Sequence, residues 1–169
     1  KTKEAIDEDG WFHTGDIGTL DEHRMLTITD RKKEIFKLSG GKYVAPQQVE
    51  NQFKESQFIE QIIVIGENEK FTSALIVPDF EFLHNWCTIH KVSFRDNDDL
   101  IKKKRIIDRY QVELDKYNPE LDQVAQVKVF KIVSENWTPE NGMLSPTQKL
   151  KRKVVIQKYS HLLDDIYSK

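Results

Sequence analysis

The chain has 169 residues and a formal net charge of −2, with 38% hydrophobic and 32% charged residues. This length predicts one domain, or one domain with an insertion, with enough apolar material for a core under a heavily charged surface. A balanced charge gives no net attraction to nucleic acid or to an anionic membrane, and we expect no nucleic-acid partner. The only cysteine, Cys87, excludes an internal disulfide framework and a cysteine-based zinc site.

Metal binding, secretion and membrane insertion are also disfavoured. The histidines at positions 13, 23, 84, 90 and 161 show no metal-ligand spacing, so we predict no metal held by the protein. The longest apolar runs, Ile62–Ile65 and Ala74–Val77, have the length of strands and fall far short of a membrane span. The start of the chain does not resemble a signal peptide. We therefore expect a cytoplasmic protein without a transmembrane segment, while peripheral membrane association stays open.

The first part of the chain predicts a β-hairpin and a third extended segment. Ile17–Leu20 and Met25–Thr29 are β-type runs on either side of a polar turn, and the charged residues from Asp30 onward are expected to break the second strand. Ile35–Leu38 continues in extended form, and the Ser-Gly-Gly-Lys stretch 39–42 predicts a loop.

A helix and a second hairpin are expected next. Pro46 suits the first helical position, where the N–H that proline lacks would have no partner, and Val49 and Phe53 then share one face. Gln61–Ile65 and Phe71–Val77 are β-rich runs joined by a short polar turn, so they predict a hairpin of central strands.

Two helices are predicted after this hairpin. Asp79 is suited to cap a helix that carries Leu83 and Trp86. The second helical stretch is expected to begin near Asp98 and to end before Pro119. Its apolar face is expected to consist of Ile107, Tyr110, Leu114 and Tyr117.

A strand, a loop and a helix are predicted for the end of the chain. Val127–Val133 is β-rich, and the stretch 134–146, rich in Pro, Asn and Gly, predicts a loop. The terminal helix is expected to bury a face formed by Val155, Tyr159, Leu162 and Ile166. This order of elements predicts an α+β fold, in which a small mixed β-sheet and a hairpin are covered by helices.

A dense aromatic and glycine cluster, Trp11–Asp16, precedes the first strand. By itself, its Gly-Asp pair would predict a turn. The cluster resembles the aromatic-x-Thr-Gly-Asp signature of AMP-forming adenylating enzymes, the superfamily of acyl-CoA synthetases, luciferases and peptide-synthetase adenylation domains. The resemblance implies that Asp16 accepts hydrogen bonds from the ribose hydroxyls of ATP, and an ionised carboxylate is suited to two neighbouring hydroxyl donors.

A second segment resembles the hinge of the same superfamily. In residues 30–35 the resemblance places a contact to the nucleotide ribose on Arg31 and the hinge on Lys33. A hinge needs a few backbone positions that can change φ and ψ between rigid elements. The resemblance also implies that Gly40 and Gly41 line the pantetheine tunnel for CoA, where missing side chains permit close approach. Without the other motifs, both stretches would be interpreted as ordinary turns.

The third motif, Leu144–Lys153, resembles the C-terminal lysine motif of the superfamily. The resemblance places the catalytic lysine on Lys149 and the last arginine of the motif on Arg152. An ammonium group that reaches both the carboxylate and the α-phosphate would orient the reactants and stabilise the developing charge. Many members have glycine where this chain has Gln148, although the long-chain fatty-acid branch also lacks it. An isolated lysine here would be interpreted as part of a basic surface helix.

The three motifs in this order resemble the small, mobile C-terminal domain of an AMP-forming acyl-CoA synthetase, most like the long-chain fatty-acid–CoA ligase branch. The resemblance implies that residues 1–32 are the end of the large domain, with a nucleotide-contacting hairpin, and that residues 33–169 form the C-terminal lid domain, with a helical insertion at about 79–126. Fatty acid, ATP and CoA would be the substrates, and Mg²⁺ would accompany ATP without being held by this domain. The partner would be the large N-terminal domain of the same polypeptide, without which the chain is expected to be inactive.

Two alternatives stay open. The acceptor of the acyl group could differ, as in a peptide-synthetase adenylation domain or an acyl-carrier-protein ligase. The chain could instead be a non-catalytic interaction module that binds through its basic clusters, Lys102–Arg105 and Lys149–Lys153. Acidic residues surround both clusters and no aromatic residues are interleaved with them, which favours solvated surfaces over nucleic-acid binding.

Overall fold

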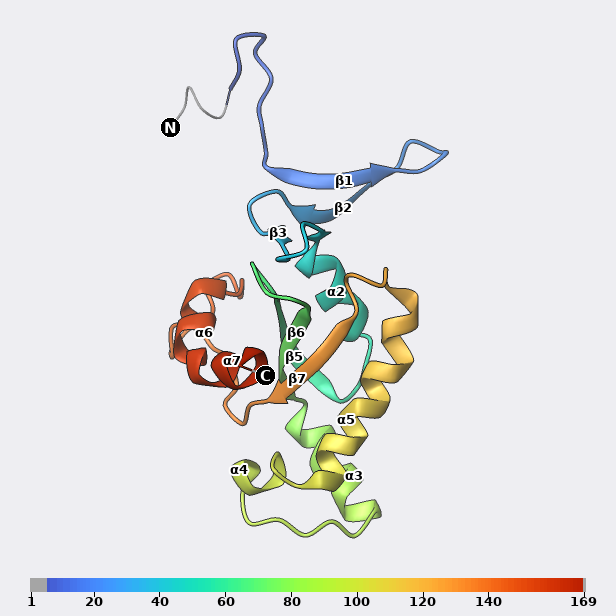
Figure 1. Cartoon of the computed structure of the whole chain (residues 1–169), viewed down its shortest axis with the longest axis vertical. Coiled ribbons are helices and arrows are strands. Elements are labelled where there is room, and N and C mark those ends of the chain that lie inside the picture. The colour runs from blue at the N-terminus through green and yellow to red at the C-terminus, as the bar shows by residue number, and fades with distance from the viewer. Residues whose placement is uncertain (1–5, 169) are drawn as a thin grey trace.

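A computed structural model describes residues 6–168 and shows an α+β fold whose small sheets are covered by helices (Figure 1). The strands are β1 (Asp16–Leu20), β2 (Leu26–Arg31), β3 (Phe36–Lys37), β4 (Tyr43–Val44), β5 (Ile59–Ile65), β6 (Thr72–Pro78) and β7 (Val127–Ile132). The helices are α2 (Pro46–Phe53), α3 (Phe80–Ile89), α4 (Asn97–Leu100), α5 (Lys104–Tyr117), the 3-10 helix η1 (Asn118–Glu120), α6 (Arg152–Lys158) and α7 (Ser160–Tyr167).

The predicted N-terminal hairpin is confirmed. Strands β1 and β2 pair in antiparallel register, with Asp16 opposite Arg31 at the open end. The Asp21 carboxylate holds the turn, because it accepts hydrogen bonds of 2.8 Å from the backbone N–H groups of His23 and Met25. In Figure 1 this hairpin projects from the end of the molecule that also carries β3 and the start of α2.

The mixed sheet has β6 at its centre, antiparallel to β5 and parallel to β7. The predicted pairing of β5 with β6 is confirmed. The expectation that both are central strands is wrong for β5, which is an edge strand among the described residues. The chain returns from β6 through α3, α4 and α5 to the far side of β6, and this crossover gives the parallel partner.

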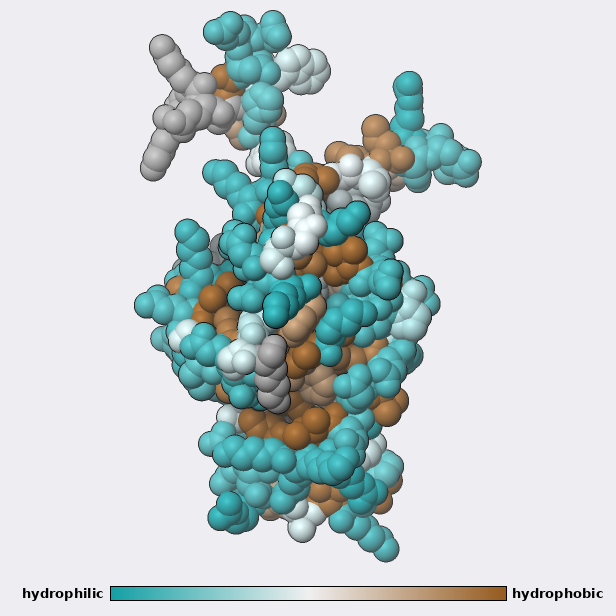
Figure 2. All heavy atoms as spheres, in the orientation of Figure 1, coloured by the Kyte–Doolittle hydropathy of each residue, from teal (hydrophilic) through white to brown (hydrophobic). Residues whose placement is uncertain are grey.

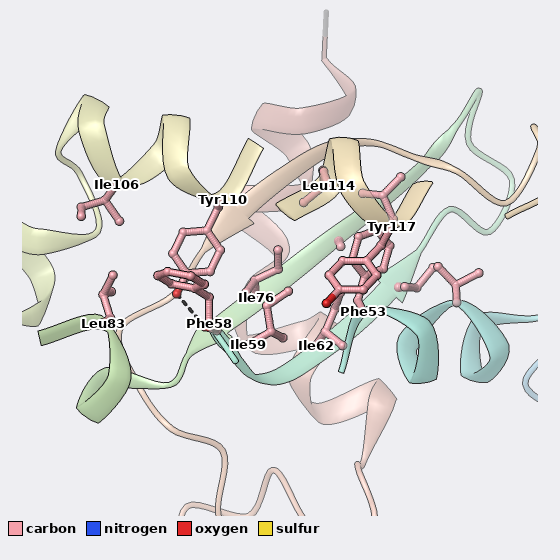
Figure 3. Close-up of a cluster of buried hydrophobic side chains, with 14 of the residues drawn as sticks. Phe53, Phe58, Ile59, Ile62, Ile76, Leu83, Ile106, Tyr110, Leu114 and Tyr117 are labelled. Atoms are coloured by element: carbon pink, nitrogen blue, oxygen red, sulfur yellow. Dashed lines mark hydrogen bonds between the residues drawn. The ribbon is translucent and has the colours of Figure 1, made fainter. Parts of the chain in front are cut away.

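Helices cover both faces of this sheet, so its strands contribute to two cores. Alternate residues of a strand point to opposite faces. Ala74 and Ile76 of β6 lie in the core that includes residues of α2, α3 and α5, whereas Leu75 and Val77 lie in the core formed with α6 and α7. All seven residues of β6 are buried, which explains why this strand is a continuous apolar run in the sequence. Figure 3 shows part of the first core.

The helix expected from Asp98 is divided in the structure. Helix α4 ends at Leu100, and α5 begins at Lys104. The predicted face is correct except at its first member, because Ile106 is fully buried while Ile107 is 42% exposed. The buried apolar residues of α5 therefore follow steps of four, four and three residues, and the predicted face was displaced by one position at its first member.

The C-terminal helix is also divided. Tyr159 has φ −103° and ψ 21°, which ends α6, and α7 begins at the next residue. Val155, Tyr159 and Ile166 are buried as predicted, but Leu163 takes the buried place that was expected for Leu162. The break at Tyr159 changes the direction of the chain, so a single helical period could not describe both halves.

The hydroxyl of Tyr110 provides a test of the first core. It is fully buried and donates a 2.7 Å hydrogen bond to the carbonyl oxygen of Phe58 (Figure 3). We expect Tyr110→Phe to lower the free energy of unfolding by about 1–2 kcal/mol, because the Phe58 carbonyl loses its side-chain partner in a buried site. Urea unfolding followed by circular dichroism measures this change, and an unaltered midpoint would contradict it.

Candidate functional site

The open end of the hairpin brings two predicted nucleotide-binding residues together. Arg31 Nε lies 3.1 Å from Asp16 Oδ1 across the two strands. The Asp16 side chain is 27% exposed and that of Arg31 is 54% exposed, so both groups reach solvent. The backbone N–H of Lys32 donates a 2.8 Å bond to the Gly15 carbonyl and closes this end of the hairpin. A carboxylate beside a guanidinium on a fixed strand end can present both an acceptor and a set of donors to a polar ligand.

A neighbouring carboxylate, Asp30, was not singled out from the sequence. It was expected to break the strand, but β2 runs through Arg31 and the Asp30 side chain turns inward, with only 1% of the residue exposed. Its oxygens accept hydrogen bonds from the backbone N–H groups of Arg31 (2.6 Å) and Gln47 (3.0 Å). Helix α2 has Ala45 at its N-cap and no local side-chain cap. Asp30 therefore caps α2 from a distant strand and joins the hairpin to it.

The predicted hinge residue, Lys33, follows β2 directly. It is exposed and lies in a tight turn, because the N–H groups of Glu34 and Ile35 both donate to the Arg31 carbonyl. Lys33 also lines a groove of about 480 Å³ whose opposite wall includes Leu150–Lys153. The structure thus brings the predicted hinge close to the segment that follows Lys149.

The predicted glycine loop connects β3 to β4. The N–H of Gly41 donates to the Leu38 carbonyl at 2.9 Å, and Gly41 has φ +85°, a conformation that L side chains rarely adopt. Gly40 is exposed, and a Cβ placed on it would meet no atom within 4 Å. Gly41 is therefore required by the turn itself, whereas nothing within the described chain requires glycine at position 40.

Lys149 stands at the end of a second tight turn. Its backbone N–H donates to Ser145 Oγ (3.0 Å), and its carbonyl accepts from the Ser145 N–H (2.8 Å). Leu144 and Leu150 form an isolated antiparallel bridge at the base of this turn. The Lys149 side chain is exposed, and its ammonium forms no ion pair with any of residues 6–168. The turn thus presents a solvated cation on a fixed backbone.

The backbone conformation at Gln148 is one that suits glycine, the residue of the common motif at this position. It has φ +60°, in the left-handed region that glycine adopts without a steric cost. We expect Gln148→Gly to raise the free energy of unfolding by about 0.5–1 kcal/mol, the steric relief outweighing the extra freedom of an unfolded glycine. Thermal unfolding measures this gain. A Gln148→Ala control keeps the strained backbone and should give no gain, and equal behaviour of the two variants would contradict the explanation.

The Arg152 side chain is mostly withdrawn from solvent, unlike a solvated member of a basic run. Its Nη1 lies 2.5 Å from Glu50 Oε1, and its Nη2 donates to the Val64 carbonyl. The Glu50 oxygen also accepts a 2.8 Å bond from the Val64 N–H, and Glu50 is 7% exposed. Burial raises the pKa of the Glu50 carboxyl, while Arg152 and the Val64 N–H act in the opposite direction. Glu50 was not identified from the sequence, because its partner is 102 residues away.

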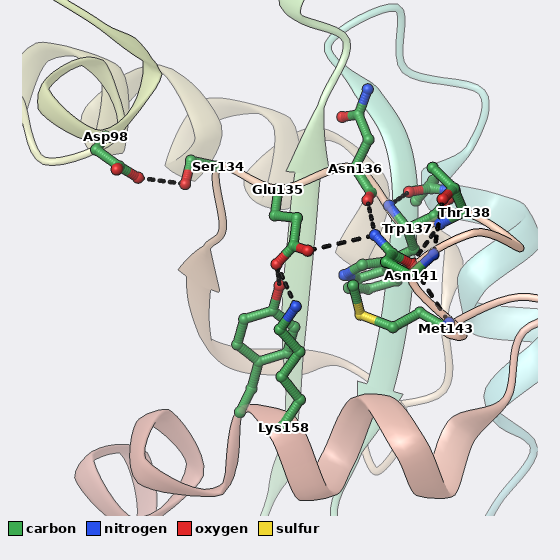
Figure 4. A network of polar contacts seen from close by, with 11 residues as sticks. Asp98, Ser134, Glu135, Asn136, Trp137, Thr138, Asn141, Met143 and Lys158 are labelled. Carbon is green, nitrogen blue, oxygen red and sulfur yellow. Dashed lines mark hydrogen bonds and ion pairs between the residues drawn. The ribbon is translucent and has the colours of Figure 1, made fainter.

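The loop before Lys149 is well ordered by side-chain contacts (Figure 4). The Asn141 amide accepts a 3.0 Å bond from the Thr138 N–H and donates a 2.8 Å bond to the Asn136 carbonyl. Trp137 is 2% exposed, and its backbone N–H donates a 2.7 Å bond to the side-chain oxygen of Gln61. The predicted loop 134–146 therefore has a fixed shape, and it carries the fully buried Met143 into the second core.

The predicted site residues do not all contact one another. Asp16 and Arg31 are paired, while no hydrogen bond or ion pair within residues 6–168 joins the Lys149 side chain to either of them or to the glycine loop. In the same part of the chain, no group of three or more His, Cys, Asp or Glu side chains could hold a metal. No helix among these residues is both long and apolar enough to cross a bilayer.

Large apolar side chains are exposed on and near the hairpin. Leu20, Met25, Leu26 and Ile28 are each more than half exposed, and Trp11 is 73% exposed. In Figure 2 brown atoms are visible on the projecting hairpin. Several exposed large apolar side chains on a projecting element are typical of a contact with another protein part.

Known proteins are similar to this chain in sequence. A family model described as the AMP-binding enzyme C-terminal domain matches residues 33–169. The chain is 40% identical over 174 residues to Long-chain-fatty-acid–CoA ligase 1 of Homo sapiens and 37% identical over 169 residues to Long-chain-fatty-acid–CoA ligase FadD15 of Mycobacterium tuberculosis. Both alignments cover 99% of this chain, but only 24% and 28% of the relatives. The chain thus spans about a quarter of the length of the curated relatives it matches.

Solved structures agree with the sequence comparison. The A domain of a carboxylic acid reductase from Segniliparus rugosus, in complex with AMP and a co-purified carboxylic acid, is similar with a TM-score of 0.80 at 28% identity. The corresponding domain from Mycobacterium chelonae gives a TM-score of 0.79 at 26% identity. Each covers 99% of this chain and 25% of the solved chain. The chain therefore belongs to the family of AMP-binding enzyme C-terminal domains, and its long-chain-fatty-acid–CoA ligase relatives agree with this assignment.

Proposed function

We propose that the full protein is an AMP-forming long-chain fatty-acid–CoA ligase, and that this part supplies its catalytic lysine and its thioester-forming face. In the first step the fatty-acid carboxylate would attack the α-phosphate of ATP, giving acyl-AMP and pyrophosphate. In the second, the CoA thiol would attack the acyl carbonyl, giving acyl-CoA and AMP. The observation that carries the proposal is the exposed Lys149 ammonium on a turn fixed at both ends, within the segment that the family model matches.

Each predicted residue has a chemical task in this scheme. Lys149 would bind the carboxylate and the phosphoryl oxygens as negative charge develops. Asp16 would accept hydrogen bonds from the ribose hydroxyls, and Arg31 beside it would donate to the same sugar. Gly40 and Gly41 would let the pantetheine arm of CoA pass close to the backbone. Mg²⁺ would arrive with the phosphates of ATP.

The domain would have to move if Lys149 serves the first step and the glycine loop serves the second. The glycine loop lies between β3 and β4, whereas Lys149 lies on a different turn, between β7 and α6, so each step would use its own orientation of the domain. We propose that residues 33–169 rotate about Lys33 relative to residues 1–32, which would belong to the large domain. The family match, which begins at Lys33, and the exposed apolar hairpin both support this division. A cytoplasmic location remains part of the proposal.

The comparisons bear on the acceptor of the acyl group. The solved structures at 26–28% identity are adenylation domains of carboxylic acid reductases, whereas the sequence relatives at 37–40% are long-chain-fatty-acid–CoA ligases. The higher identity supports CoA as the acceptor. Two of the four cations in the cluster Lys102–Arg105 are paired within the chain, Lys103 with Asp99 and Lys104 with Asp108, which weakens the alternative of a basic interaction module.

The full-length protein provides the test. Incubated with ATP, Mg²⁺, CoA and fatty acids of graded length, it should release AMP and pyrophosphate and form acyl-CoA from the long acids. The isolated chain of 169 residues should show no turnover under the same conditions, because the phosphates and the acid would be bound elsewhere. Turnover by the isolated chain, or transfer to a carrier protein in preference to CoA, would contradict the proposal.

A further inference from the structure

Lys149 depends on its backbone for its direction, since its ammonium has no ion pair with residues 6–168. The turn that carries it has two supports. On one side, Met143 is fully buried, and its carbonyl accepts a 2.8 Å bond from the N–H of Lys151. On the other side, Arg152 lies three residues after Lys149 at the start of α6, with its side chain 15% exposed.

The second support joins distant parts of the domain. Arg152 contacts Glu50 of α2 and the carbonyl of Val64 in β5, and Glu50 in turn accepts from the N–H of Val64. One carboxylate and one guanidinium thus join the start of α6 to α2 and to the sheet. Helix α2 is also the element that Asp30 caps from the hairpin.

We propose that Glu50 and Arg152 are positioning residues for Lys149 and set where its ammonium lies during formation of the acyl-adenylate. This inference rests on the proposed function, because it assumes that Lys149 acts in the first step. Neither side chain would touch substrate. Their effect would pass through the backbone of residues 149–152, and displacement of a catalytic group by about 1 Å can cost about 100-fold in rate.

A buried ion pair can also be only a structural contact, so the test needs a readout that stability alone does not change. In the full-length protein, the two half-reactions can be measured separately. Acyl-adenylate formation is followed by pyrophosphate exchange into ATP, and thioester formation by the reaction of supplied acyl-adenylate with CoA. The first variant is Glu50→Gln. The second combines Glu50→Gln with Arg152→Met, so that it leaves no unpaired buried charge.

A matched control exists in the same domain. Arg109 and Glu113 form another ion pair on α5, in which Glu113 is buried and Arg109 half-buried, and Glu113 also accepts a 2.5 Å bond from Ser56. The double variant Arg109→Met, Glu113→Gln removes a similar pair that contacts no residue of the Lys149 turn. We expect this control to change the rates of both half-reactions by the same factor. All assays are run well below the melting temperature of each variant.

The expected result is a selective loss. Acyl-adenylate formation should fall by about 10- to 100-fold in the Glu50 and Arg152 variants, while thioester formation stays within about twofold. Combined with Lys149→Ala, the same changes should cause no further loss, because they act through the missing group.

Other results would overturn the inference. Equal loss in both half-reactions, as in the Arg109 and Glu113 control, would mean a structural role, and no loss in either would mean no role. Additive loss in the Lys149→Ala background would mean that the pair acts independently of the lysine. If Lys149→Ala alone left acyl-adenylate formation unchanged, the proposed role of Lys149 would fail first, and this outcome is distinct from the others.

Discussion

Replacing Lys149 by alanine is expected to lower the rate of acyl-adenylate formation in the full-length protein by about 100- to 1,000-fold. The physical reason is that negative charge builds on the phosphoryl oxygens in the transition state, where an ammonium group stabilises it more than in the ground state. The exposed side chain contributes little to packing, so the free energy of unfolding should change by less than about 0.5 kcal/mol. Pyrophosphate exchange measures the rate, and thermal unfolding checks the fold.

The same variant should retain the second half-reaction. Acyl-adenylate supplied from outside should react with CoA at close to the normal rate, because the glycine loop serves that step in the proposed scheme. Lys102→Ala provides the control, since Lys102 is an exposed lysine in the loop between α4 and α5. An undiminished rate of acyl-adenylate formation in the Lys149 variant would contradict the assignment of the catalytic lysine.

The second large effect is expected at Asp16. Asp16→Asn should raise the KM for ATP by about 10- to 100-fold, because hydrogen bonds to a charged acceptor contribute about 1.5–3 kcal/mol each and the amide replaces one acceptor oxygen by a donor. The ion pair with Arg31 would be lost as well, but it is exposed at the surface and contributes little to stability. Initial rates at varied ATP concentration measure the effect.

Two controls distinguish a lost contact to the ribose from a change in the fold of the Asp16→Asn variant. Glu22→Gln, an exposed substitution in the turn of the same hairpin, should leave the KM for ATP unchanged. The normal protein should bind 2′,3′-dideoxy-ATP, which lacks both ribose hydroxyls, as weakly as the Asp16→Asn variant binds ATP. A variant that still distinguishes the two nucleotides as well as the normal protein would show that Asp16 does not contact the ribose.

Local signals account for what could be predicted from the sequence. The hairpin followed from two β-type runs around the Asp21 turn, and α2 followed from Pro46 and the spacing of Val49 and Phe53. Asp79 caps α3 as expected, by accepting a 2.8 Å bond from the N–H of Phe82. These features depend on side-chain period and turn chemistry within a few residues, which a sequence displays directly.

The sequence by itself therefore determined the α+β class and the order of most elements, but not β4 or η1. Its resemblance to the superfamily pointed to the candidate residues Asp16, Arg31, Lys33, Gly40, Gly41 and Lys149. Only the tertiary structure decided which strand is central, where the two long helices break, and how Asp30 and Glu50 are used. Asp30 meets Gln47 across 17 positions and Glu50 meets Arg152 across 102, so no local pattern could indicate either contact. A buried carboxylate must find a partner, and the fold alone decides which donor is near it.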